Sequence, residues 1–192
     1  NPVANSATDV TLTIVSSDGG ATGTGGTQID TDTLTLDLQA VNDAPTAAIT
    51  NATFSATEQN NLTLANLGIS LGSVADLDAG SSDISVTLSV TYGILTITSG
   101  NSGITVASGN GTSSVTITGT VTEINNLLGG VNLSSTEGTI VYNPNTDAPP
   151  ASATLTLLVN DNGNTGTGGA LTASDTATIN ITAVNDAPAV SN

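Results

Sequence analysis

A hexapeptide occurs twice, unchanged, in this chain. Ala-Val-Asn-Asp-Ala-Pro stands at 40–45 and again at 183–188. The interval between Val41 and Val184 is 143 residues (184 − 41), which predicts the length of a repeating unit. Proline fixes φ and biases the preceding residue toward extended backbone, so each Asp-Ala-Pro indicates an extended exit from one domain into the next. We therefore expect repeated domains joined by short, stiff linkers.

The residues before each hexapeptide also recur at this interval. Residues 11–15 and 33–41 alternate apolar and polar side chains, and 154–158 and the segment up to Val184 do the same. A period of two is typical of strands with one buried face. Gly-Thr-Gly-Gly separates the two strands of each pair, and without a following lysine or a strand-to-helix context it is interpreted as a flexible hairpin loop rather than a phosphate-binding loop.

The repeat predicts three parts of the chain. Residues 1–45 are the C-terminal part of one repeat, 46–188 are a complete repeat, and 189–192 begin the next. The first part supplies one hairpin, which is marginal in water because its apolar face has nothing to cover it. Either preceding residues of a longer array complete this sandwich, which we favour, or a neighbouring molecule donates the absent strands.

The remaining pattern is typical of an all-β fold. Short alternating segments such as 84–90 and 94–97 are separated by turns rich in glycine and asparagine. Only 122–128 has helical spacing, with threonine as its N-cap. We expect an antiparallel Greek-key β-sandwich of the cadherin-like or immunoglobulin-like kind, with at most one short helix per repeat. Because 143 residues exceed the roughly 100 of an immunoglobulin-type domain, residues 93–119 are expected to supply extra strands or a long hairpin.

The charge balance excludes several classes of function. The chain has 16 acidic residues and no lysine, arginine or histidine, for a formal net charge of −16. Nucleic acid and anionic membrane surfaces require cationic side chains, so neither is an expected partner. The absence of cysteine and histidine excludes thiolate and imidazole ligands, thiol nucleophiles and the usual general base. Inorganic cations are the natural counterions.

Four acidic motifs, in their order along the chain, resemble a known family. They are Glu58, the turn Asp76-Leu77-Asp78, the turn Asn160-Asp161-Asn162-Gly163 and the linker Val-Asn-Asp-Ala-Pro. This set is similar to the bacterial cadherin-like, immunoglobulin-like tandem repeats of large calcium-dependent surface adhesins. The resemblance covers 46–188 and the end of a second copy.

The resemblance implies calcium ions between successive domains. It places Asn42 and Asp43 of the linker beside Asp76, Asp78 and Asp161, and it places Glu58 beside Asn185 and Asp186 at the next junction. Asp18 matches Asp161 and would bind at the junction with a preceding unit. One departure is that Glu58 is followed by Gln59, where many such repeats carry a second acid, which leaves that site with one ligand fewer.

The chemistry of the residues supports calcium independently. Ca²⁺ takes six to eight hard oxygen ligands, and this chain offers only oxygen ligands. Converging carboxylates repel one another by roughly 1–4 kcal/mol per close pair, and no cationic side chain offsets this. Other acids are interpreted as turn caps. Those turn acids are Asp9, Asp37, Asp83, Asp147, Glu123 and Glu137, while Asp30, Asp32 and Asp175 are undecided.

The sequence thus favours a non-enzymatic structural repeat. It would act as a spacer in a calcium-rigidified adhesin or surface filament, extracellular on a bacterial cell or secreted. Its partners would be neighbouring repeats, like chains in a fibre, or surface ligands bound through other domains. The alternatives are a carbohydrate- or receptor-binding sandwich, for which only Phe54, Tyr92 and Tyr142 offer aromatic rings, and a glycosidase with paired carboxylates about 5–10 Å apart.

Overall fold

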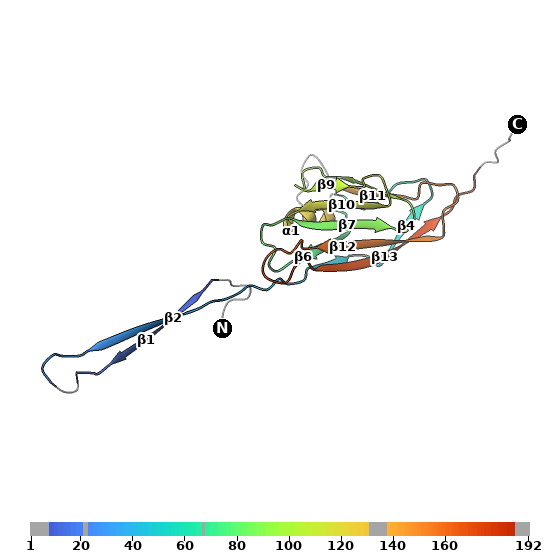
Figure 1. The fold of residues 1–192 in the computed structure, drawn as a ribbon. Coiled ribbons are helices and arrows are strands. Elements are labelled where there is room, and N and C mark those ends of the chain that lie inside the picture. Colours follow the sequence, from blue (N-terminus) through green and yellow to red (C-terminus); the bar gives the residue numbers. More distant parts are fainter. Residues whose placement is uncertain (1–7, 21–22, 67, 131–137, 187–192) are drawn as a thin grey trace. The chain divides into compact units, whose positions relative to one another are not determined.

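The computed structural model describes residues 8–20, 23–66, 68–130 and 138–186. The chain divides into two compact units, residues 1–41 (unit 1) and 42–192 (unit 2) (Figure 1). The division falls inside the first hexapeptide, between Val41 and Asn42. Glu137 and the segment 189–192 lie outside the described residues, so the predicted start of a third repeat stays a prediction.

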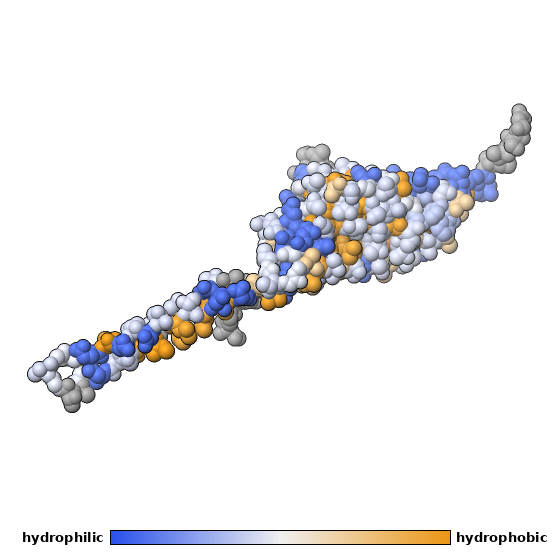
Figure 2. All heavy atoms as spheres, in the orientation of Figure 1, coloured by the Kyte–Doolittle hydropathy of each residue, from blue (hydrophilic) through white to orange (hydrophobic). Residues whose placement is uncertain are grey.

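Unit 1 is a single antiparallel hairpin in its described part. Strand β1 (Val10–Ser17) pairs with β2 (Ile29–Leu36). The second strand begins and ends earlier than the predicted 33–41. One face carries Val10, Leu12, Ile14, Leu34 and Leu36, which are all exposed, Leu12 at 47%. Figure 2 shows hydrophobic atoms, in orange, at the surface along the hairpin.

Unit 2 contains the other strands and the helix. They are β3 (Thr46–Ile49), β4 (Thr53–Thr57), β5 (Leu62–Ala65), β6 (Gly72–Ala75), β7 (Ile84–Val90), β8 (Ile94–Thr98), β9 (Thr105–Ser108), β10 (Ser114–Gly119), α1 (Val121–Gly129), β11 (Thr139–Asn143), β12 (Ser152–Asn160) and β13 (Thr172–Thr182). The predicted all-β class is confirmed.

The strands of unit 2 form three sheets. One has the order β4-β13-β12-β7-β10-β9, a second β5-β11-β8, and a third β3-β6. Described strand pairs are antiparallel except β4 with β13, which are parallel and depart from the purely antiparallel expectation. The segment 93–119, predicted to hold extra strands, divides between two sheets: β8 pairs with β11, while β9 and β10 extend the six-stranded sheet.

A single hydrophobic core joins these sheets. Every second residue of β7, from Ile84 to Val90, is buried, as the alternation predicts. The core also takes side chains from β10, β12 and β13 of the six-stranded sheet, from β8 and β11 of the three-stranded sheet, and from α1. Each fully buried aliphatic side chain contributes about 1.5–3 kcal/mol, so this core stabilises unit 2 without disulfides.

Helix α1 closes one part of the core. Its N-cap is Thr120, whose hydroxyl accepts from the Glu123 amide at 3.3 Å, while the Glu123 carboxylate accepts from the Thr120 amide at 2.8 Å. This reciprocal capping box satisfies two backbone donors that the first turn leaves free. The cap is therefore Thr120 and not Thr122, and the Glu123 carboxylate is a structural cap. No helix in the described ranges is long and apolar enough to cross a membrane.

The two hairpins that precede the hexapeptides have the same register. In β1–β2, Leu12 lies opposite Leu34, and 143 residues later Leu155 of β12 lies opposite Ala177 of β13. The environments differ, because Leu155 is fully buried and Leu12 is half exposed. Strand pairing is therefore common to both copies, whereas burial depends on the rest of the repeat.

Asp175 connects two of the sheets. One carboxylate oxygen of Asp175 in β13 accepts from the Ile49 amide of β3 at 2.7 Å, and the other accepts from the Thr176 amide at 2.8 Å. These two bonds, from Ile49 first and then Thr176, lower the pKa of Asp175. With both oxygens bonded to backbone, Asp175 acts as a structural acceptor.

We expect Asp175→Asn to lower the melting temperature of the chain at neutral pH. A lowered pKa in the folded state gives stability that is fully present above the unfolded pKa, near 3.9, and is lost as pH falls through the folded value. The difference in melting temperature between wild type and variant should therefore shrink at acidic pH. Thermal melts by circular dichroism between pH 2 and 7 measure this, with Asp83→Asn as the matched control; a pH-independent difference would contradict it.

Candidate functional site

Asn42 is the first residue of unit 2 and is buried, with 6% of its surface exposed. Its side-chain amide donates to a carboxylate oxygen of Asp161 at 2.7 Å and to the Gly169 carbonyl at 2.9 Å. Its backbone amide donates to the Thr167 carbonyl at 3.0 Å. The structure thus brings together two predicted ligands, Asn42 and Asp161, that are 119 positions apart in sequence.

Asp161 follows β12 and is fully buried. Its Oδ1 accepts from the amides of Gly163 and Leu171, both at 2.8 Å. Burial raises the pKa of Asp161, but the bonds from Gly163, Leu171 and Asn42 outweigh it and the pKa is lowered. The carboxylate therefore stays ionised in the interior, because hydrogen bonds to the charged form favour it.

The Asp76-Leu77-Asp78 turn lies next to the linker. Asp76 Oδ1 accepts from the amides of Asp78 at 3.2 Å and Ala79 at 3.3 Å, and Asp78 Oδ2 accepts from the Asp43 amide at 3.0 Å. Burial, followed by the neighbouring Asp78 carboxylate, raises the pKa of Asp76. The Asp-x-Asp spacing thus places two carboxylates side by side at the linker, with Leu77 pointing outward.

Several oxygens of this group have no hydrogen-bond partner. They are Asn42 Oδ1, Asp76 Oδ2 and Asp78 Oδ1, and all three atoms are buried. An unsatisfied buried acceptor costs about 1–3 kcal/mol, and more when it is charged. Hard oxygen atoms of carboxylate and amide type are the ligands of Ca²⁺, so this donor set fits the expected ion.

The predicted calcium ligands near the linker include an amide as well as acids. Among the described residues, no three acidic side chains form a group that would hold a metal ion by themselves. The predicted ligands at this end of unit 2 combine the carboxylates of Asp43, Asp76, Asp78 and Asp161 with the amide oxygen of Asn42, and among them Asn42, Asp76 and Asp78 keep an unpartnered buried oxygen. Such mixed oxygen shells are ordinary for Ca²⁺.

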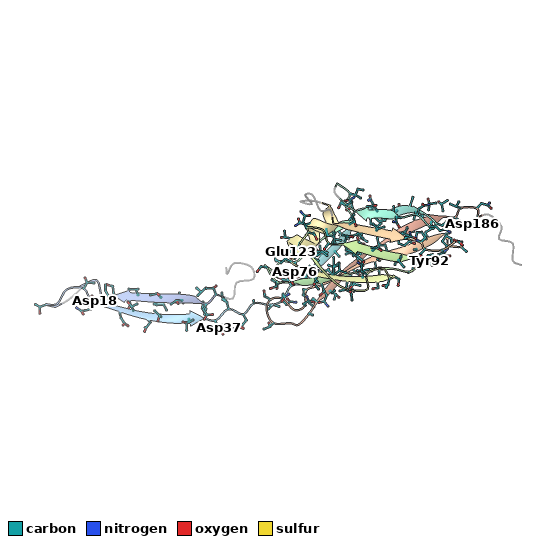
Figure 3. All side chains as sticks on the ribbon, turned by 90° about the horizontal axis from the view of Figure 1, so that it is seen from above. Asp18, Asp37, Asp76, Tyr92, Glu123 and Asp186 are labelled. Carbon is teal, nitrogen blue, oxygen red and sulfur yellow. The ribbon has the colours of Figure 1, made fainter. Side chains whose placement is uncertain are left out.

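Glu58 lies at the other end of unit 2. Its backbone amide donates to the carbonyl of Thr182 at the end of β13, at 3.0 Å. Glu58 is 2% exposed, and both of its carboxylate oxygens are buried without a partner. Asn185 and Asp186, predicted to share its site, follow β13 and are exposed. Figure 3 shows Asp76 and Asp186 at opposite ends of the unit.

Gln59 is exposed beside Glu58. Its side-chain amide donates to Asp147 Oδ1. Asp147, interpreted from sequence as a turn cap, is thus tied to the neighbour of Glu58.

Asp18 in unit 1 accepts the same two backbone hydrogen bonds as Asp161 in unit 2. Its Oδ1 accepts from the amides of Gly20 and Gln28, both at 2.9 Å, and these bonds lower its pKa. Gly163 and Leu171 are the residues 143 positions later that bond Asp161. The predicted equivalence of Asp18 and Asp161 therefore extends to their backbone partners, although Asp18 is exposed.

Sequence reasoning missed the contribution of the glycine-rich segment between β12 and β13. The Thr165 hydroxyl donates to the Asp78 carbonyl at 2.8 Å, and the Thr167 and Gly169 carbonyls bind Asn42. The available signal was that Gly-Thr-Gly-Gly recurs at the same interval as the linker and Asp161. This shared interval indicates that the Gly-Thr-Gly-Gly segment contributes to the same site as the linker and Asp161.

Comparison with known proteins found no matching family model and no matching curated protein. A solved structure similar to this chain is the crystal structure of domains 4 and 5 of the S-layer protein SbsC. The two are 14% identical, and the match covers 82% of this chain with a TM-score of 0.33. The chain matches 65% of the length of that structure.

Proposed function

We propose that this chain is a non-enzymatic structural module, part of a tandem array of cadherin-like Greek-key sandwiches that calcium stiffens. The array acts as a spacer in an adhesin or surface filament outside a bacterial cell. Calcium binds at both ends of unit 2, at Asn42, Asp43, Asp76, Asp78 and Asp161, and at Glu58 with Asn185 and Asp186.

One observation carries this proposal. In the described part of the chain, six buried side-chain oxygen atoms lack a hydrogen-bond partner, and five of them belong to residues that the sequence predicts as calcium ligands. Three are on Asn42, Asp76 and Asp78, and two are on Glu58; the sixth is the Tyr142 hydroxyl. Native interiors rarely leave such atoms unsatisfied, so their concentration on the predicted ligands supports a bound cation.

The electrostatics of the linker end support the same conclusion. Asp76 and Asp78 repel one another at close range, and the raised pKa of Asp76 follows from its burial and from that neighbour. A divalent cation reverses this repulsion, since it attracts both carboxylates. Bound only by the folded arrangement, it stabilises that arrangement by mass action.

The aromatic residues argue against the carbohydrate-binding alternative. Sugar recognition of the usual kind stacks the sugar on exposed rings, and the chain has three aromatic residues in all. Tyr142 is fully buried, and Phe54 and Tyr92 pack partly against the same core. None of the three is a free platform, which favours the structural role.

The repeated hairpin supports a tandem array. Asp18 and the β1–β2 register match Asp161 and the β12–β13 register position by position. In unit 2 the equivalent apolar face is covered by the rest of the repeat, whereas in unit 1 it is exposed. A preceding repeat that supplies the equivalent strands would bury that face.

We expect Asp76→Asn and Asp78→Asn each to weaken calcium binding by roughly tenfold or more, because each removes a carboxylate charge from the linker end. Asp83→Asn is the matched control: it removes an equal charge from an exposed carboxylate near the turn. Isothermal titration calorimetry of the three variants measures the dissociation constants. Equal losses in all three would mean that general charge, and not this turn, binds the ion.

We also expect calcium to raise the melting temperature of the chain. At a concentration about 100 times the dissociation constant, one bound ion stabilises by about 2.7 kcal/mol, which for a domain of this size corresponds to roughly 5–10 °C. Differential scanning calorimetry in calcium and in chelator measures the shift, with sodium at matched ionic strength as control. Identical melting temperatures would refute the calcium assignment.

A further inference from the structure

The segment from Gly163 to Ala170, here called the glycine loop, holds the linker through backbone acceptors. The Thr167 carbonyl accepts from the Asn42 backbone amide at 3.0 Å, and the Gly169 carbonyl accepts from the Asn42 side chain at 2.9 Å. Asp161, at the base of the loop, accepts the second side-chain bond at 2.7 Å. Every atom that the loop and Asp161 present to Asn42 in these bonds is an acceptor.

A site lined by acceptors selects for a donor. The Asn42 amide supplies two N–H bonds from one short side chain, which matches two acceptors on different segments. Aspartate at this position has the same shape but only acceptors when ionised, and it would face the buried Asp161 carboxylate. Alanine leaves that carboxylate without its side-chain donor. The geometry therefore distinguishes asparagine from its nearest isostere.

The glycine loop has supports that do not involve the linker. The Thr165 hydroxyl donates to the Asp78 carbonyl at 2.8 Å, and the side-chain amide of Asn164 donates to the Asp83 carbonyl at 2.8 Å. Asn162, directly before the loop, donates to the same Asp83 carbonyl at 3.0 Å. Gly168 has a φ of +140°, and a Cβ there would lie 3.7 Å from the Asn42 Cβ. The loop is thus tied to the acidic turn and passes close to Asn42.

We propose that the glycine loop and Asp161 form a docking site specific for the side-chain amide of the linker asparagine, and that this docking needs no bound ion. The docking itself does not depend on the proposed calcium function. Its role does rest on that function, because docking would hold the unpartnered Asn42 Oδ1 in place as a calcium ligand. Docking of Asn42 then precedes cation binding.

The chain contains its own control. Asn185 has the same sequence neighbours as Asn42, because both lie in the repeated hexapeptide. Asn185 is exposed, however, whereas Asn42 is buried. The same substitution at the two positions separates the effect of docking from the effect of changing the hexapeptide.

The experiment is amide hydrogen exchange by NMR on the full chain in excess chelator, comparing wild type with Asn42→Asp, Asn42→Ala and Asn185→Asp. In wild type, the residue 42 amide should be protected without any metal. Both substitutions at Asn42 should reduce that protection by about tenfold or more, because two hydrogen bonds are lost. Asn185→Asp should leave it within about twofold, as expected for a surface change.

A second variant and an internal reference keep the test decisive. Thr165→Val removes the bond to Asp78 without touching Asn42, and it should lower protection at residue 42 while the Leu155 and Leu157 amides of β12 keep theirs. Protection at residue 42 that appears only with calcium would overturn the docking proposal and leave the calcium function intact. Unchanged protection in Asn42→Asp, or an equal loss throughout β12, would also overturn it. Metal-free docking without any calcium affinity would support docking and refute the proposed function.

Discussion

The chain contains no cationic side chain to neutralise its acids, and the structure of unit 2 depends on how each buried carboxylate is stabilised instead. With 16 acidic residues and no lysine, arginine or histidine, ion pairs between side chains are impossible. The available partners are N–H and O–H donors or a bound cation. Burying a charge without either costs several kcal/mol.

Two groups of carboxylates follow from this constraint. Asp161 is satisfied by two backbone amides and the Asn42 side chain, and Asp175 by two backbone amides, so their pKa values are lowered. Asp76 and Asp78 each keep an unpartnered buried oxygen, Glu58 keeps two, and the pKa of Asp76 is raised. The first group holds strands and loops together, and Asp161 also binds the side chain of Asn42, another of the proposed calcium ligands. The second lies at the two ends of the unit, where a cation would complete the bonding.

The linker residues Asn42 and Asp43 bind one carboxylate from each of these two groups. Asn42 uses its N–H groups on Asp161 and the glycine loop, and its side-chain carbonyl oxygen stays buried without a hydrogen-bond partner. The Asp43 amide meanwhile satisfies one oxygen of Asp78. Asn42 and Asp43 thus provide donors to two acids of unit 2, and only the donors at position 42 require a side-chain amide, because the donor of Asp43 is its backbone N–H.

The hairpins show which part of the fold is local. β1–β2 and β12–β13 share register, and the backbone partners of Asp18 and Asp161 are at equivalent positions, although the described part of unit 1 has only the β1–β2 sheet. Alternation and turn chemistry depend on neighbouring residues, so both copies form the same hairpin. Burial of Leu155 comes from strands far away in sequence, which Leu12 does not have in the described chain.

The sequence by itself determined the all-β class, most strand positions, the repeat interval and the residue types at the candidate site, because period-two alternation and a repeated motif are local signals. Tertiary structure alone decided that β4 runs parallel to β13, that Thr120 and not Thr122 caps the helix, and which carboxylate oxygens stay unpartnered. It also decided that the Gly-Thr-Gly-Gly segment binds Asn42. These features depend on contacts between residues such as Asn42 and Gly169, which are 127 positions apart. Pairings over such distances follow from how the whole core packs, so they cannot be predicted from residues that are neighbours in the sequence.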